Sequence, residues 1–237
     1  MRRYYCFTYL LCWVTILTVS CIGCSKPVTT PSTGQSQEQA MVITLPEPRY
    51  TSNVSIERSL LRRRSVRSFT NEPLTLQEIS QLLWAAQGIT DSLGRRTAPS
   101  AGALYPLEIY LVAGNVKSLA PGVYKYQPEE HRLVRVMDGD IRNGLADAAL
   151  GQGSVRGGAI AFVITAVYQR TTVKYGDRGI RYVHIEVGHA AENLCLQATA
   201  MELGAVTIGA FEDERVAEVL KLPENEKPLY IIPVGHK

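Results

Sequence analysis

The chain has 237 residues, of which 46% are hydrophobic and 20% are charged. This composition excludes collagen-like, coiled-coil and wholly disordered proteins, because enough apolar side chains are present to build a core. The formal net charge of +3 arises from 25 Lys and Arg against 22 Asp and Glu, without a long basic block, and it argues against nucleic-acid binding.

The first 23 residues are typical of a targeting signal. Two arginines precede an uncharged run over residues 4–22, which is the pattern of a secretory signal. Cys21 and Cys24 each follow small residues, as does the acylated cysteine of bacterial lipoproteins, which the segment resembles. We favour Cys24 as the lipidation site because Gly23 suits a cleavage, while Cys21, an uncleaved anchor and plain secretion are the alternatives. The sequence thus predicts an extracytoplasmic protein, anchored in a membrane by its N-terminal lipid or anchor.

Residues 24–45 are predicted to form a flexible tether, because most of them are Ser, Thr, Gln, Pro and Gly. One folded domain is expected over residues 46–237. Cys195 is its only cysteine, so no intrachain disulfide is expected there. Its apolar, helical surroundings favour a packed thiol over a nucleophile.

The first predicted elements are helices. A short helix begins near Ser55, and Thr75 with Glu78 forms a capping box for a second helix that stops at Gly88. A buried strand follows over residues 108–113. The next prediction is a hairpin whose strands and turn cover residues 123–136.

The second half of the chain mixes helices and strands. Residues 181–203 carry the longest helical pattern. The other predictions are helices over 138–150 and 213–220 and strands over 159–167, 205–208 and 229–234. This mixture predicts an α+β fold, with one sheet flanked by helices.

The first cluster that carries chemistry follows the short helix. It contains Arg63, Arg64, Ser65 and Arg67, whose guanidinium forks and hydroxyl group suit a phosphate. In an extended chain the alternate residues would place their donors on one side. A solvated basic turn is the alternative.

Two further clusters are rich in small residues. The loop over residues 99–106 is bounded by two prolines, and its backbone would let a flat ring approach closely. Gly209 and Ala210 follow a predicted strand and leave backbone N–H groups accessible to a ligand. Each segment alone is also compatible with an ordinary loop.

Together the three clusters resemble the FMN-dependent nitroreductase family, and more closely its SagB-type branch, which includes the azoline oxidases. The resemblance covers about residues 57–237 and includes Arg-Arg-Ser-Val-Arg-Ser-Phe at 63–69, Pro-Ser-Ala-Gly-Ala-Leu-Tyr-Pro at 99–106 and Glu-Val-Gly-His-Ala-Ala-Glu-Asn at 186–193. It implies a nitroreductase-like fold whose central, mainly antiparallel sheet is flanked by helices. It also implies an obligate homodimer with FMN at the subunit interface.

The resemblance also implies roles for single residues. The FMN phosphate, ribityl and pyrimidine side would be held by Arg63, Arg64, Ser65 and Arg67, with the C-terminal Lys237 as a further phosphate-binding cation. The isoalloxazine ring would lie along Pro99, Ser100, Ala101 and Gly102. Gly209 and Ala210 would lie near flavin N5.

Lys174 and Tyr175 resemble the Lys-Tyr pair that azoline oxidases use beside the flavin. A tyrosine hydroxyl next to an ammonium group could act as a general base. The alternative is that Lys174 is solvated and Tyr175 packs. The chain departs from many nitroreductases at Ala103, where they carry Asn, and at Tyr105, where they carry Gln, which fits the SagB-type branch better.

These observations predict an enzyme that transfers a hydride between FMN and a small organic substrate. Because nicotinamide nucleotides do not cross membranes freely, the predicted location favours a quinol or oxygen as redox partner. An NAD(P)H-dependent nitro or quinone reductase is the alternative, and a non-catalytic ligand- or partner-binding lipoprotein on the same fold is the alternative of another class. No metal is expected, because Glu186 and His189 form a single pair and not a ligand set.

Overall fold

The computed structural model describes residues 41–237, which form seven strands and seven α-helices within that range. The strands are β1 (Val42–Thr44), β2 (Leu107–Ala113), β3 (Gly122–Gln127), β4 (Arg132–Asp138), β5 (Ile160–Ala166), β6 (Leu203–Ala205) and β7 (Lys227–His236). The helices are α1 (Ile56–Arg62), α2 (Leu76–Gln87), α3 (Arg142–Ala148), α4 (Gly153–Gly157), α5 (Gln169–Tyr175), α6 (Arg178–Ala200) and α7 (Asp213–Leu220), with short 3₁₀ turns η1 (Ala101–Ala103) and η2 (Pro128–Glu130).

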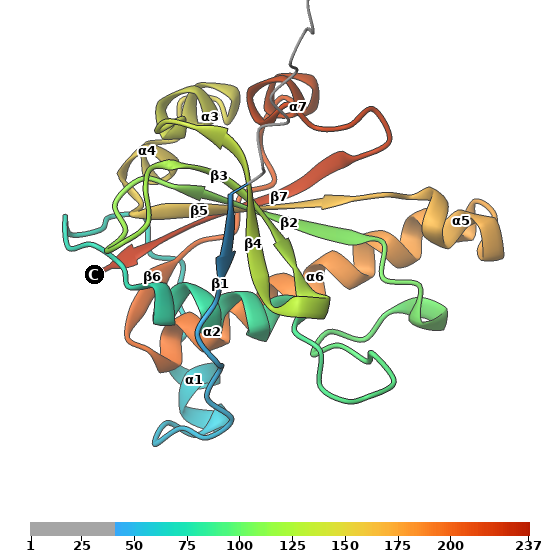
Figure 1. Ribbon diagram of the computed structural model, residues 1–237, viewed down its shortest axis with the longest axis horizontal. Coiled ribbons are helices and arrows are strands. Elements are labelled where there is room, and N and C mark those ends of the chain that lie inside the picture. Colours follow the sequence, from blue (N-terminus) through green and yellow to red (C-terminus); the bar gives the residue numbers. More distant parts are fainter. Residues whose placement is uncertain (1–40) are drawn as a thin grey trace, which may run out of the picture. The chain divides into compact units, whose positions relative to one another are not determined.

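The strands form one sheet in the order β1-β4-β3-β2-β5-β7-β6, and every neighbouring pair in it is antiparallel. Helices cover both faces: α1, α2 and α6 lie on one side of the sheet, and α3, α4 and α7 lie on the other (Figure 1). Each face therefore has its own apolar core. This arrangement confirms the predicted α+β, nitroreductase-like fold with an antiparallel sheet.

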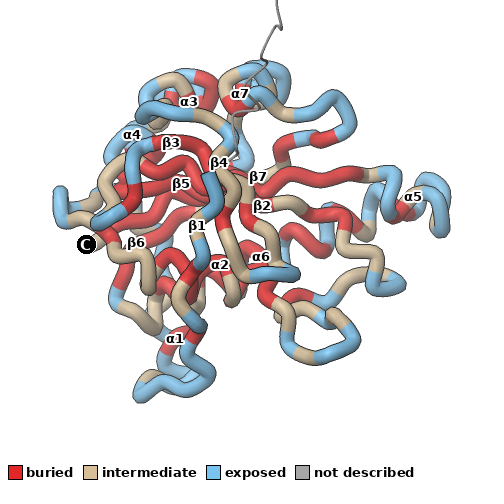
Figure 2. The backbone as a smooth tube through the Cα atoms, viewed as in Figure 1, coloured by how far each residue is buried: buried red, intermediate tan, exposed pale blue. Residues whose placement is uncertain are grey.

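The central strand β5 shows why the sheet is stable between two helical layers. It pairs with β2 on one side and β7 on the other, and all seven of its residues are buried. Figure 2 shows the central strands buried and the outward surfaces of the helices exposed. A strand covered on both faces favours apolar side chains, which explains the apolar run over residues 160–164. The buried Thr165 is the polar residue of the strand, and its hydroxyl donates a hydrogen bond to Glu226 over 3.0 Å.

Helix α2 begins as its capping box predicts. The Thr75 hydroxyl accepts a hydrogen bond from the backbone N–H of Glu78 over 3.2 Å, and the Glu78 carboxylate accepts one from the backbone N–H of Thr75 over 2.7 Å. These two bonds satisfy amide groups that the helix cannot pair internally. The predicted hairpin is present as β3, η2 and β4, and α7 spans the expected residues.

The structure differs from the sequence-based expectation at the end of the long helix. Helix α6 ends at Ala200, and Glu202 takes a left-handed φ of 62°. Leu203 can then pair with His236 of β7, so β6 begins where the helix was expected to continue. The pairing with β7 decides this boundary, and helical periodicity does not reveal it.

Three elements have no counterpart among the predictions: β1, α4 and α5. Strand β1 pairs with β4 over residues 42–44, so the fold takes in residues that were expected in the tether. Helix α5 carries Lys174 and Tyr175. It is only about two turns long, too short for a periodic pattern to identify it.

The predicted extracytoplasmic, membrane-anchored localisation needs correction. Within residues 41–237, no helix combines the length and the apolar character that crossing a membrane requires. The longest helix, α6, carries charged side chains such as Arg181, Glu186 and Glu192 along its length. The predicted signal segment and the lipidation site Cys24 lie outside the described residues.

Candidate functional site

The arginine-rich segment runs along an edge of the sheet. Arg63 caps the C-terminal end of α1, and the chain then becomes extended. Ser65 forms a parallel bridge with Ala205 of β6, and the Val66 N–H donates a hydrogen bond to the Ala205 carbonyl oxygen over 3.0 Å. The extended path exposes the side chains of Arg64, Ser65 and Arg67 to solvent.

Positive charge accumulates along this segment. The C-terminal Lys237 lies next to it, because the backbone N–H of Thr70 donates to the His236 carbonyl over 2.8 Å. Within residues 41–237, the only ion pair made by these side chains joins Arg63 Nε to Glu192 of α6 over 3.3 Å. The structure therefore brings five of the predicted cofactor-binding residues together, and we call them the basic edge: Arg63, Arg64, Ser65, Arg67 and Lys237.

Gly209 and Ala210 lie near one end of the basic edge. The Gln152 side-chain amide donates a hydrogen bond to the Ala210 carbonyl over 3.1 Å. Gln152 and Arg67 line the same open hollow of about 600 Å³, at the N-terminus of α4. The two exposed small residues and the arginines thus approach the same part of the surface.

The small-residue loop lies elsewhere, against α5. Gly102 has a φ of 65°, and a Cβ atom added there would lie 2.8 Å from the Tyr175 hydroxyl oxygen and 3.0 Å from Lys174 Nζ. The left-handed conformation favours glycine, and the close approach shows that the polar ends of Tyr175 and Lys174 lie against this residue. Tyr175 in turn packs edge to face on Tyr182 of α6, with ring centroids 5.1 Å apart. We call this group the loop cluster: Pro99, Ser100, Ala101, Gly102, Lys174, Tyr175 and Tyr182.

Glu186 of α6 is a site residue that the sequence reasoning did not assign. Its exposed fraction is 3%, and its Oε1 has no hydrogen-bond partner among the described residues. Burial raises the pKa of this carboxyl to about 7, although the Ser100 hydroxyl and the charge of Arg96 counteract the shift. One signal was available: the acid occupies the apolar face of α6, between Val183 and Ala190, where a charged residue is unusual.

Glu186 lines a hollow of about 300 Å³ at the loop cluster. Its walls come from the loop and from one face of α6: Pro99, Ser100, Ala101, Tyr182, Ile185, Glu186 and His189. Among residues 41–237, no three His, Cys, Asp or Glu side chains gather as metal ligands would. The hollow combines apolar walls with one buried acid, which suits a small organic ligand.

Arg96 was also missed, and it holds the start of the small-residue loop. Its guanidinium lies 4.6 Å from the centroid of the Tyr105 ring and forms an ion pair with Glu129 over 3.1 Å. It also donates a hydrogen bond to Gln87 of α2 over 3.0 Å. These contacts join the loop to a helix and a hairpin, so the loop is supported from both sides.

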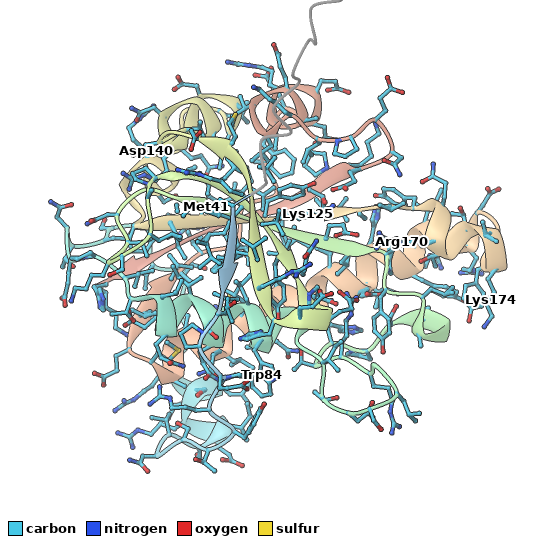
Figure 3. All side chains as sticks on the ribbon, in the orientation of Figure 1. Met41, Trp84, Lys125, Asp140, Arg170 and Lys174 are labelled. Atoms are coloured by element: carbon cyan, nitrogen blue, oxygen red, sulfur yellow. The ribbon has the colours of Figure 1, made fainter. Side chains whose placement is uncertain are left out.

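The basic edge and the loop cluster contact α6 at different positions. Arg63 contacts the helix at Glu192, and Tyr175 contacts it at Tyr182, ten residues or about 15 Å away along the helix. The loop segment Pro99–Ala101 lies between these two contacts, beside Glu186 and His189. Lys174 on α5 and the C-terminus lie on opposite sides of the folded part (Figures 1 and 3). One chain therefore presents the predicted site residues as two separate groups.

The Nitroreductase family model matches residues 60–236. A protein of Methanocaldococcus jannaschii that carries a provisional nitroreductase name is 49% identical over 197 residues, which are 83% of this chain and 97% of that protein. A solved structure from Ralstonia eutropha JMP134, also with a provisional nitroreductase name, is 31% identical with a TM-score of 0.72. That match covers 90% of this chain and 95% of the other.

Two other relatives carry names that refer to an activity or an operon. The FMN reductase (NADPH) of Bacillus subtilis is 29% identical over 78% of this chain and 66% of its own length. The trifolitoxin operon protein TfxC of Rhizobium leguminosarum bv. trifolii is 28% identical over 74% of this chain and 54% of its own length. This chain thus spans little more than half of TfxC, whereas the Methanocaldococcus relative is matched almost end to end.

Proposed function

The chain belongs to the nitroreductase family, and from that premise we propose that it binds FMN and transfers a hydride between the flavin and a small organic substrate. The family makes it a flavin oxidoreductase. The choice of FMN and the residues that hold it are our proposal. The observation that carries the proposal is the basic edge, where one extended segment carries three arginines and a serine and lies next to the chain end that carries Lys237.

The donor set of the basic edge fits a phosphate dianion. Three arginines can each offer paired N–H groups, Ser65 offers a hydroxyl, and Lys237 adds a point charge. Glu192 neutralises only part of this charge through Arg63. Arg64 is positioned by its own hydrogen bonds to the Leu61 and Arg63 carbonyls, over 3.2 and 2.7 Å.

The small residues fit the flat ring of the same cofactor. Gly209 and Ala210 are exposed beside the basic edge, so that their backbone groups can face the ring near N5. The loop over residues 99–102 offers a second surface without bulky side chains. When bound, FMN supplies the hydride chemistry, and the protein supplies position and charge.

A homodimer reconciles the two separate groups of residues. In one chain the contact of Arg63 with Glu192 and the contact of Tyr175 with Tyr182 lie about 15 Å apart along α6. In a dimer the loop cluster of one copy can face the basic edge of the other, and two composite sites result. Exposed apolar side chains on this part of the surface, such as Val173 at 88% and Ile185 at 50%, are suited to burial between subunits.

Within the family, we propose the SagB-type branch and a role for Lys174 and Tyr175 beside the substrate. Their polar ends approach Gly102, in the loop assigned to the ring. The similarity to the trifolitoxin operon protein supports this branch. The similarity to the Bacillus FMN reductase (NADPH) favours the second candidate, an NAD(P)H-dependent nitro or quinone reductase. The predicted location, which argued against a nicotinamide donor, has been corrected, so that argument no longer applies.

The absorption spectrum of the purified protein tests the proposed function. We expect a yellow protein whose chromophore is released by denaturation and is FMN by chromatography. Loss of the flavin absorbance when NADH or NADPH is added without oxygen would favour the reductase. Loss of that absorbance only with a substrate that is itself oxidised would favour an enzyme of the SagB-type branch. A colourless protein that takes up no added FMN would overturn both and favour the non-catalytic binding protein.

A further inference from the structure

Glu186 has no role in the cofactor-binding arrangement proposed above. It is buried, and one of its carboxyl oxygens has no hydrogen-bond partner within residues 41–237. An ionised carboxylate is strongly disfavoured in such a place, whereas a protonated one can use its O–H as a donor. A buried acid that keeps its proton near neutral pH is a recurrent device for proton transfer in enzymes.

The position of Glu186 places this acid at a ligand-sized hollow. The acid forms part of the wall, next to the loop segment Pro99–Ala101. Of the charged and titratable groups nearby, Arg96 before the loop acts on Glu186, and Tyr182 and His189 of α6 line the same hollow. Lys174 and Tyr175 of α5 reach the loop at Gly102. Among these groups Glu186 is the buried acid, and its Oε1 has no hydrogen-bond partner within residues 41–237.

We propose that Glu186 is a proton donor and acceptor for a small quinone or similar carbonyl-type oxidant that shares this hollow with the flavin ring, for which the loop over residues 99–102 is also proposed. The proposal rests on the proposed function. When bound, reduced FMN would supply a hydride with its two electrons, and Glu186 would supply the one further proton that the substrate needs. The O–H bond of the carboxyl group breaks as an O–H bond forms on the substrate oxygen, and the remaining carboxylate regains a proton from water. In the reverse direction the carboxylate accepts the proton.

The protonation of Glu186 can be measured without turnover. The FMN-loaded protein is labelled with ¹³C-glutamate, and its carboxyl resonances are followed as the pH changes. The resonance of Glu186 is identified because it is absent from the spectrum of the Glu186→Gln variant. We expect it to titrate near pH 7, well above the ordinary value of 4.5. Titration in the ordinary range would overturn the proposal.

A second experiment measures the proton transfer itself. The loaded protein is reduced with dithionite, mixed with p-benzoquinone and followed by flavin absorbance between about pH 5 and about pH 9. The wild-type rate should fall about tenfold per pH unit once the carboxyl is ionised, while Glu186→Gln should be slower by about a hundredfold or more and independent of pH. Glu186→Asp, which keeps the acid, should restore a pH dependence.

The matched control is Glu218→Gln, which changes an exposed acid on α7, away from the hollow. It should behave as the wild type does. A Glu186→Gln protein that keeps the wild-type pH profile would overturn the proposal, even if its stability or FMN content changes, because that result assigns Glu186 a structural role. Failure of the proposed function is a different result, since the wild-type protein itself would then lack FMN.

Discussion

Arg63 is placed by two elements at once. It ends α1 through its backbone and contacts α6 through Glu192. Because both neighbours hold it, the guanidinium is pre-positioned for an anion, and a smaller entropic cost then opposes binding.

Replacing Arg63 by alanine should weaken FMN retention. The lost contact is a hydrogen bond to a charged group, which contributes about 1.5–3 kcal/mol, so the dissociation constant should rise about 10- to 150-fold. Equilibrium dialysis or fluorescence titration with FMN measures this change. Arg58→Ala, an exposed arginine on α1, is the matched control and should bind as the wild type does. Equal affinity in Arg63→Ala would place the phosphate elsewhere.

Glu186 also leads to a prediction about stability. The folded-state pKa of about 7 lies above the ordinary 4.5, so between these values the folded protein binds more protons than the unfolded chain does. The contribution of Glu186 to the free energy of unfolding is therefore fully present below pH 4.5 and declines as the pH rises to about 7, by on the order of 3 kcal/mol. Glutamine does not ionise and should lack this decline.

Urea unfolding of the wild type and of Glu186→Gln at pH 4.5 and at about pH 8 checks this prediction. The variant should gain relative stability at the higher pH. A difference between the two proteins that is the same at both pH values would show that Glu186 titrates alike in the folded and unfolded chains.

At the scale of elements, α2 joins residues 47–49 to the core on its face of the sheet, through hydrogen bonds of Gln77 and Gln81. Its inward residues, among them Ile79, Leu82 and Leu83, are fully buried, and the helix packs along α6. The capping box at Thr75 determines where this helix begins. The helix contributes Gln87 to the support of Arg96 and therefore of the small-residue loop.

Thr75→Ala should destabilise the fold by about 1 kcal/mol, because the amide of Glu78 loses its acceptor. The free energy of unfolding from urea titration measures this loss. Thr75→Ser keeps the hydroxyl and should retain most of the stability. Since the cap lies outside both the basic edge and the loop cluster, FMN binding should be unchanged, and a loss of FMN in the alanine variant would contradict this separation.

At the scale of the whole molecule, the two separate groups of site residues predict how subunits cooperate. If each site combines the basic edge of one copy with the loop cluster of the other, a heterodimer of Arg63→Ala and Gly102→Ala chains has one site with both defects and one intact site. If each site lies within one chain, both sites of that heterodimer are defective.

Co-expression of the two variants with different affinity tags isolates the heterodimer, and its FMN content distinguishes these arrangements. We expect about one high-affinity FMN per heterodimer and weak binding in either parent homodimer. Analytical ultracentrifugation should also show that the wild-type protein is a dimer. A monomer that binds FMN tightly, or a heterodimer with no high-affinity site, would refute the composite site.

Much of this protein is determined by local sequence patterns. The capping box at Thr75, the apolar run of β5 and the hairpin around η2 are each encoded within a few residues, so the α+β fold could be predicted. Arg63–Arg67 and the loop 99–102 could be predicted as binding segments for the same reason, because each is a contiguous run of suitable residues. The family resemblance suggested what they bind.

Other features of the protein depend on contacts between residues far apart in the chain, and only the tertiary structure determines them. The end of α6 follows from the pairing of Leu203 with β7, and the position of Lys237 follows from the contact of Thr70 with His236. Burial in the folded chain raises the pKa of Glu186, and Ser100 and Arg96, which lie far from it in the sequence, lower it. Periodicity and motifs report only which residues are neighbours along one element. Desolvation, ion pairing and the separation of the two site groups arise from distances between elements, and only the folded chain determines those distances.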